Sequence, residues 1–273
     1  MRSEAACQLL TPIDDGTDAA ARVLDPNYGV QQKFDGRRIL LHVERTSVTA
    51  YNREGRPYDR MSKDILTEAK RFSVFAPLLF DAEWIREINS LYCFDLIELE
   101  GIDLRPNTFI DRIAYLTRAF KHHETTLIHQ ARTEVEQEGK VALVTQIWDW
   151  NLEGIAAKRL DSPYFIGRSP HNYKYKRTHD ASFLVIRRNQ KASVDLGLFD
   201  DNNRLITVGS VQIRDKRFGA VTEGTILDVR YMHAFRNSNQ IYQPRMLRIR
   251  DDLRPDSCLL SQLRYKAANP IAL

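Results

Sequence analysis

A change in the sequence pattern at about residue 179 constrains the fold more than any other feature. Up to residue 178, short apolar stretches with strand character alternate with stretches of helical spacing. From His179 onward, β-rich stretches follow one another with Gly, Asn and Asp between them. This change predicts an α+β domain over residues 1–178 and a small closed β-barrel over residues 179–273, with a hinge at residues 176–180.

Two hairpins and two helices are predicted in the first domain. The hairpins join Ile39–Val43 to Ser47–Tyr51 and Leu78–Trp84 to Leu91–Leu99. The helices are Phe109–His122 and Glu134–Trp150, the second capped by Thr133, and Gly154–Arg159 follows as a strand. In the second domain five strands are expected, which suits the OB-fold: Phe183–Arg188, Ser193–Phe199, Leu205–Ile213, Thr225–Phe235 and Met246–Arg250.

Composition places the chain among ordinary globular proteins. Of its 273 residues, 43% are hydrophobic and 28% are charged. No apolar stretch approaches the ~18 residues that a membrane helix needs, and Met1–Leu10 does not resemble a secretory signal. Three cysteines far apart favour neither disulfides nor a zinc site. We therefore expect a cytoplasmic protein without a membrane partner.

Positive charge is concentrated in the last third of the chain. Residues 179–273 contain 15 Lys and Arg against 10 Asp and Glu, whereas residues 1–178 contain 25 against 26. Such an excess is typical either of a domain that binds a polyanion or of a domain that is merely basic and soluble. Charge alone leaves both interpretations open.

The stretch Lys33-Phe34-Asp35-Gly36-Arg37-Arg38 combines a lysine, an acid, a glycine and two arginines. A lysine acts as a covalent nucleophile once its proton is removed, and neighbouring arginines suit a phosphate electrophile. Further along, Phe80-Asp81-Ala82-Glu83 ends an apolar strand in acids that are able to hold a metal or a ribose hydroxyl. Taken singly, each of these motifs is more often structural than functional.

Taken together, these motifs resemble the covalent nucleotidyltransferase superfamily, and within it the minimal, two-domain ATP-dependent DNA ligases. Residues 33–38 resemble the family's nucleophile motif Lys-x-Asp-Gly-x-Arg, and residues 52–55 its short Arg-x-Gly element. Phe80–Glu83, Tyr92–Ile97 and Glu153–Lys158 resemble the following motifs. The stretch Ser162–Arg168, leading to Tyr173–Lys176, is the most discriminating, because capping enzymes and most RNA ligases lack it. The resemblance covers nearly the whole chain and implies an adenylation domain of antiparallel sheets with flanking helices, followed by an OB-fold.

The resemblance also implies roles for single residues. Lys33 would attack the α-phosphate of ATP. Catalytic roles are implied for Lys33, Asp35, Arg38, Lys174 and Lys176. Contacts with the nucleotide are implied for Gln31, Gln32, Lys33, Arg38, Arg53, Glu83, Phe94, Lys158, Lys174, Lys176, Arg248 and Arg250. Glu83 and Glu153 would hold Mg²⁺ or Mn²⁺.

Four positions depart from the family pattern. Gln31 stands where the family often has Glu, Ala82 replaces Gly, Tyr173 replaces Trp, and Leu253 replaces the lysine of the sixth motif. A glutamine still accepts a hydrogen bond from the adenine amino group. The lost lysine would weaken contact with the outer phosphates of ATP.

The sequence therefore predicts a monomeric ATP-dependent DNA ligase that seals nicks in duplex DNA through a lysyl-AMP intermediate. The chain shows no N-terminal extension of the kind that accompanies NAD⁺ use, which favours ATP. Two alternatives remain open. One is an RNA ligase or an mRNA-capping guanylyltransferase, and the other is an inactive nucleic-acid-binding module.

Overall fold

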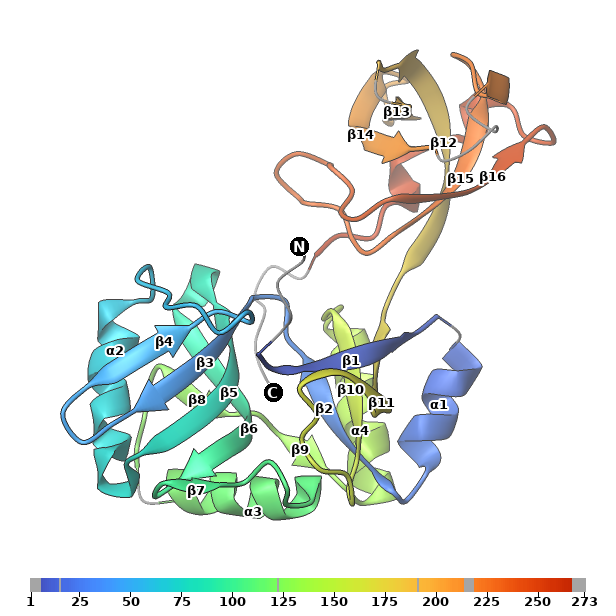
Figure 1. The fold of residues 1–273 in the computed structure, drawn as a ribbon. Helices are drawn as coiled ribbons and strands as arrows, with labels where there is room; N and C mark the ends of the chain where they lie inside the picture. The colour runs from blue at the N-terminus through green and yellow to red at the C-terminus, as the bar shows by residue number, and fades with distance from the viewer. Residues whose placement is uncertain (1–5, 15, 122, 191, 214–218, 267–273) are drawn as a thin grey trace. The chain divides into compact units, whose positions relative to one another are not determined.

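The computed structural model describes residues 6–266 except 15, 122, 191 and 214–218. The chain divides into two compact units, of which the N-terminal unit ends at Lys176 and the C-terminal unit begins at Arg177. Figure 1 labels the helices and strands of both units. Among the described residues, no helix is long and apolar enough to cross a membrane.

Two sheets form the framework of the N-terminal unit. Sheet I has the strand order β1 (Gln8–Ile13), β11 (Gly167–Lys176), β10 (Gly154–Arg159), β2 (Tyr28–Lys33) and β9 (Thr133–Glu134). Sheet II has the order β4 (Val48–Tyr51), β3 (Arg37–Val43), β5 (Leu78–Ile85), β6 (Ser90–Leu99) and β7 (Ile102–Asp103), and β8 (Ile128–Gln130) pairs with β6. Since β2 belongs to sheet I and β3 to sheet II, the three residues between them, Phe34–Gly36, join the two sheets.

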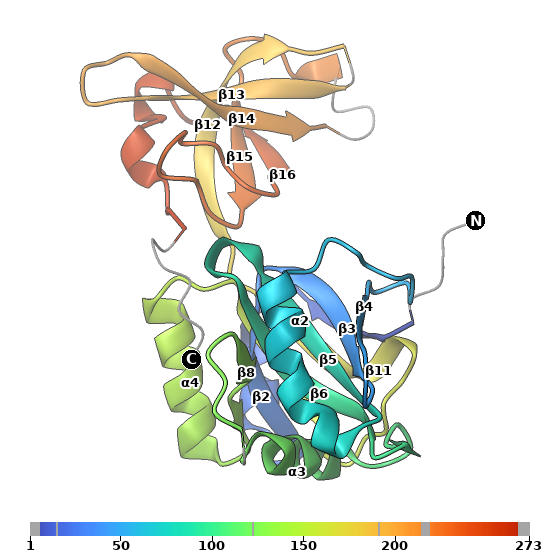
Figure 2. The same cartoon turned by 90° about the vertical axis from the view of Figure 1, so that its left-hand side faces the viewer.

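Helices cover both sheets of this unit. The helices α1 (Gly16–Leu24) and α4 (Gln137–Asp149) pack on sheet I, where Val23, Leu143 and Ile155 share one apolar cluster. The helices α2 (Lys63–Ala69) and α3 (Phe109–Phe120) pack on sheet II, as Figures 1 and 2 show. Two 3₁₀ turns lie next to sheet II, η1 (Lys70–Phe75) and η2 (Arg86–Ile88).

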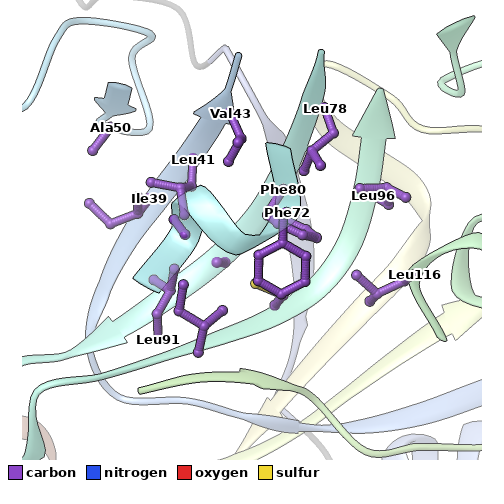
Figure 3. Close-up of a cluster of buried hydrophobic side chains, with 14 of the residues drawn as sticks. Ile39, Leu41, Val43, Ala50, Phe72, Leu78, Phe80, Leu91, Leu96 and Leu116 are labelled. Carbon is purple, nitrogen blue, oxygen red and sulfur yellow. The ribbon is translucent and has the colours of Figure 1, made fainter. Parts of the chain in front are cut away.

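The larger core lies against sheet II. Figure 3 shows the alternating side chains Ile39, Leu41 and Val43 of β3 in this cluster, with Phe72 of η1 among them. The Phe72 ring meets Phe80 edge-on, with ring centroids 5.1 Å apart. Alternation along β3 therefore buries Ile39, Leu41 and Val43 on one face of the strand, whereas Arg38 of the other face lines the cavity described below.

Both predicted hairpins are confirmed, since β3 pairs antiparallel with β4, and β5 with β6. The predicted strand Gly154–Arg159 is β10. The prediction that Thr133 caps a helix beginning at Glu134 is wrong. Thr133 and Glu134 form β9, which pairs with β2, and α4 begins only at Gln137. The end predicted for the other helix, His122, lies outside the described residues, and α3 ends at Phe120.

The C-terminal unit contains one antiparallel sheet, sheet III. Its strand order is β14 (Leu205–Gln212), β13 (Ser193–Phe199), β12 (His179–Arg188), β15 (Ile226–Tyr231) and β16 (Arg245–Arg250). Cα atoms of the two outer strands, β14 and β16, approach within 8 Å of each other. The unit buries its own apolar cluster, which includes Phe183, Leu196 and Tyr231. Two short 3₁₀ turns follow, η4 (Pro255–Ser257) and η5 (Leu260–Gln262).

Candidate active site

Lys33 is the last residue of β2, immediately before the connection between the two sheets. A Cβ atom at Gly36 would lie 2.4 Å from the backbone oxygen of Trp84, so only glycine permits this approach of the connection to β5. The Gly36 amide donates to Glu83 Oε1 at 3.2 Å. The close approach therefore places the acid of β5 beside the loop that follows Lys33.

Glu153 holds two lysines. Lys33 Nζ lies 2.5 Å from Glu153 Oε2, and Lys176 Nζ lies 2.9 Å from Glu153 Oε1. The Glu153 side chain is only 4% exposed, so little water competes for these contacts. The carboxylate is thus the nearest group able to accept a proton from Lys33.

A cavity of about 210 Å³ opens beside Lys33 in the N-terminal unit. Nine residues to which the sequence analysis assigns a role line it: Gln31, Gln32, Lys33, Arg38, Arg53, Glu83, Phe94, Lys158 and Lys174. Residues from β2, β3, β5, β6, β10 and β11 therefore meet at one place, although 141 positions separate Lys174 from Lys33 along the chain.

One end of the cavity is suited to a purine base. Gln31 Nε2 donates to the backbone oxygen of Phe94 at 3.0 Å and to Thr133 Oγ1 at 2.8 Å. Both amide hydrogens are thereby used within the protein, which leaves the Gln31 carbonyl oxygen to accept from a ligand. The Phe94 ring, which is 8% exposed, supplies an aromatic face.

Lys158 lies next to that ring and also lines the cavity. Its Nζ is 4.8 Å from the Phe94 ring centroid and donates to the Phe94 backbone oxygen at 3.2 Å. Burial lowers the pKa of Lys158 to about 8, while Asp95, 3.6 Å away, opposes that shift. A buried ammonium in this position favours electron-rich groups over cations in the cavity.

Arg38 is fixed by a buried acid. Its Nε and Nη2 atoms donate to the two oxygens of Asp81 at 2.5 and 2.6 Å, and its guanidinium carbon lies 4.5 Å from the Phe94 ring centroid. Tyr164 Oη also donates to Asp81, at 2.5 Å. Asp81 is fully buried and occupied by these contacts, so of the two acids in Phe80–Glu83 only Glu83 faces the cavity.

Burial shifts the pKa of two cavity groups. Burial raises the pKa of Glu83 to about 7, and the nearby Glu153 carboxylate adds to the rise. Burial also lowers the pKa of Lys174, as do the neighbouring cations Lys33, Lys176 and Arg168. A divalent cation near Glu83 and Glu153 would relieve the repulsion between the two acids.

The residues present fit a nucleotide and a divalent cation. In the described part of the chain, no three His, Cys, Asp or Glu residues group as a complete metal site. A cation held by Glu83 and Glu153 would need phosphate oxygens and water to complete its coordination, as Mg²⁺ commonly does. Lys174 and Arg168 line the same cavity and supply positive charge for those phosphates.

Several predicted residues lie away from the cavity lining. Asp35, in the connection after Lys33, does not line it, and Glu153 and Lys176 meet Lys33 through the ion pairs described above. Arg248 and Arg250 belong to β16 of the C-terminal unit, where both pair with Asp228.

Six residues that line the cavity received no role from the sequence: Gln8, Leu9, Leu10, Phe34, Ala156 and Arg168. Phe34 and Ala156 stand inside motifs that the sequence displays. Gln8, Leu9 and Leu10 come from β1, which joins sheet I by parallel pairing with β11. Arg168 ends the discriminating stretch of the sequence but received no role there. Its Nη1 donates to the Leu10 backbone oxygen at 2.8 Å. The position of Arg168 just before the lysines of Tyr173–Lys176 could have indicated a role in binding phosphate. The sequence of β1 shows no comparable signal.

Comparison with known proteins finds DNA ligases. Residues 81–176 match the family model described as "ATP dependent DNA ligase domain". A DNA ligase of Methanococcus aeolicus is 23% identical over 226 residues, which is 66% of this chain and 39% of that protein. A probable DNA ligase of Dictyoglomus turgidum is 24% identical over 180 residues, covering 55% of this chain and 31% of the other.

Solved structures share the fold. The ligase domain of LigD from M. tuberculosis aligns with a TM-score of 0.56 and 17% identity, over 93% of this chain and 98% of that domain. A Lig E DNA ligase aligns with a TM-score of 0.63 and 16% identity, over 89% of this chain and 98% of the other. The chain is therefore similar to ATP-dependent DNA ligases in sequence and in fold. It spans less than two-fifths of the length of either curated relative, the Methanococcus or the Dictyoglomus protein.

Proposed function

We propose that this chain is an ATP-dependent DNA ligase, acting as a monomer to seal nicks with a 3′-hydroxyl and a 5′-phosphate in duplex DNA. One observation carries the proposal. A lysine paired with a buried glutamate stands at the edge of a cavity that has an aromatic face, a glutamine acceptor and several cations. A nucleotide needs these groups together, and the similarity to DNA ligases specifies adenylate transfer.

In the first step Lys33 forms a bond to the α-phosphorus of ATP while the bond to pyrophosphate breaks. Glu153 accepts the proton that Lys33 must lose beforehand, since its carboxylate is already in contact at 2.5 Å. Lys174 and Lys176, two residues apart on β11, project to the same side of the strand and neutralise the phosphate oxygens. Gln31 and Phe94 hold the adenine.

Once Glu153 has passed the lysine proton on to water, a divalent cation held by Glu83 and Glu153, Mg²⁺ or Mn²⁺, would supply further neutralisation of the phosphate charge. Arg38 is held rigidly by Asp81 and suits a ribose hydroxyl or a phosphate without needing to reorganise. Arg53, whose side chain is 61% exposed, suits the phosphate of the incoming DNA.

In the later steps AMP moves to the 5′-phosphate of the nick, and the 3′-hydroxyl then displaces it. We propose that sheet III is the barrel of an OB-fold, which the approach of β14 to β16 supports. Its excess of basic residues suits the DNA backbone, and Arg248 and Arg250 suit the pyrophosphate of the first step.

Intact mass after incubation with ATP and Mg²⁺ tests the proposal. The wild-type protein should gain one AMP, and Lys33→Ala should gain none. A gain with GTP instead would indicate a capping guanylyltransferase, and sealing of nicked RNA rather than DNA an RNA ligase. No gain with any nucleotide would leave only a nucleic-acid-binding module.

A further inference from the structure

Two consecutive apolar side chains project from the loop between β10 and β11. Phe165 is 36% exposed and Ile166 is 57% exposed. Single exposed apolar residues are common on protein surfaces and need no explanation. This adjacent pair is of interest because residues on both sides of it fix the loop, and because a cavity-lining arginine follows it closely in the chain.

The loop is fixed on both sides of the pair. Before the pair, Tyr164 is buried. Its backbone amide donates to the Arg105 oxygen at 2.9 Å, and its hydroxyl donates to Asp81 at 2.5 Å. After it, Gly167 adopts a φ of +87°, which favours glycine, and donates its amide to the Cys7 oxygen at 3.0 Å. Two anchored residues therefore hold Phe165 and Ile166 at the surface, where the Phe165 ring meets His171 edge-on with ring centroids 6.1 Å apart.

The pair lies close in the chain to basic residues of the cavity. Arg168, two residues after Ile166, is exposed and lines the cavity, as do Lys174 and Arg53. A partner that binds both the basic residues and the apolar pair needs anionic groups and apolar surface close together. Nucleic acid does so, because deoxyribose faces and base edges lie next to the phosphates.

We propose that Phe165 and Ile166 contact nicked duplex DNA directly, packing against the sugars and the opened base step beside the nick. Apolar side chains that press on a base step in this way are a known means of gripping the minor groove. The inference rests on the proposed ligase function, and it adds a contact that no phosphate-binding residue provides.

The double variant Phe165→Ser/Ile166→Ser tests the contact, with Val74→Ser as matched control. Val74 is 71% exposed and lies in η1 of the same unit. Self-adenylylation, measured by intact mass, should match wild type in both variants. The Kd for nicked duplex should rise roughly tenfold in the double variant alone, as expected when about 1.4 kcal/mol of binding is lost.

The salt dependence of binding separates this contact from a phosphate contact. The slope of log Kd against log salt should be unchanged in the double variant, because no phosphate contact is lost. In Arg53→Ala, which removes the arginine proposed to contact a DNA phosphate, the slope should fall by about one. A double variant that binds nicked duplex as tightly as wild type, or that loses affinity through a changed slope, overturns the proposal.

A conservative variant covers the case in which serine perturbs the fold. Phe165→Leu/Ile166→Val keeps the apolar surface and should bind like wild type, and binding as weak as in the serine variant would refute the contact. The binding assay does not depend on AMP transfer. If wild-type protein binds nicked DNA but gains no AMP, the ligase function is contradicted. The apolar contact is then still tested by comparing the Kd of the double variant with that of wild type.

Discussion

Glu153 and Glu83 show how single acids set the charge around the proposed nucleophile. Glu153 is shared by Lys33 and Lys176, so the resting lysine is held in an ion pair rather than left free. Glu83 lies near enough to Glu153 for the two carboxylates to repel each other. The protein without nucleotide or metal therefore stores an unfavourable charge arrangement that a bound cation would relieve.

This arrangement predicts a pH-dependent effect of Glu83→Gln on stability. The folded-state pKa of Glu83 is about 7, above its ordinary value of 4.5, so the folded state binds the proton more tightly. Wild type should lose stability as pH rises from about 4.5 to 7, and the full penalty should persist above 7. In metal-free protein, Glu83→Gln should be more stable than wild type at pH 8 by about 1–2 kcal/mol, or roughly 3–6 °C in Tm.

Thermal denaturation of both proteins from pH 4 to pH 8 checks this. The difference in Tm should be near zero at the acidic end and grow through the window. A difference that is the same at every pH would show that Glu83 acts through packing and not through its charge.

The link between β6 and α3 depends on one buried ion pair. Asp95 of β6 and Arg112 of α3 are both fully buried, and Arg112 Nε lies 2.7 Å from Asp95 Oδ1. Burial acts to raise the pKa of Asp95, but Arg112 and Lys158 outweigh it and keep that pKa low. Removing the carboxylate would leave both cations uncompensated in the interior.

We expect Asp95→Ala to lower the free energy of unfolding by about 3–5 kcal/mol, the usual cost of breaking a buried pair from one side. Asp103→Ala is the control, since its pair with Arg105 is about half exposed and should contribute about 0–1 kcal/mol. Urea denaturation measures both. Equal losses of unfolding free energy in the two variants would show that burial does not increase the contribution of the Asp95 pair to stability.

The elements that were predicted have clear local patterns, whereas the helices α1 and α2 and several strands formed by distant pairing were missed. The hairpins β3–β4 and β5–β6 show apolar periodicity and nearby turns, and both are confirmed. β2 escaped prediction because its buried residues include Gln31 and Gln32, which hide the apolar pattern. Thr133 was misread as a helix cap because its two-residue strand is fixed only by its pairing with β2.

The site follows the same division. Lys33, Glu83, Phe94 and Lys174 stand in motifs that the sequence itself displays, and the structure gathers all four at one cavity. Gln8, Leu9 and Leu10 reach the cavity only because β1 pairs with β11, more than 150 residues away. No local pattern encodes that pairing, so no local reading of the sequence finds those residues.

At the scale of the whole molecule, each unit has its own apolar core and its own share of the proposed chemistry. In the C-terminal unit, Arg250 is engaged by two acids, since its guanidinium donates to Asp228 and to Asp252. Leu253, which replaces the lysine of the sixth motif, packs against the core of this unit. In the proposed first step, contact with the outer phosphates would therefore fall to the arginines of β16.

We expect Arg250→Ala to slow self-adenylylation roughly 10–100-fold, the usual effect of losing a hydrogen bond to a charged group. Sealing of pre-adenylated nicks should change far less, since pyrophosphate is absent from that step. Arg254→Ala is the control, because the Arg254 side chain is 87% exposed and its acidic neighbour lies 4.0 Å away. Equal losses in both assays would contradict a role specific to the first step.

The strand order of sheet I has a consequence for the newly made chain. β2, which carries Lys33, has as its neighbours β9 and β10, and β10 ends only at Arg159. At a synthesis rate of ~5–20 residues per second, β2 waits on the order of ten seconds for its partner to be translated. Sheet II, complete by Gln130, is able to form first on the ribosome. The strand that carries Lys33 is thus among the last parts of the N-terminal unit to find its neighbours during synthesis.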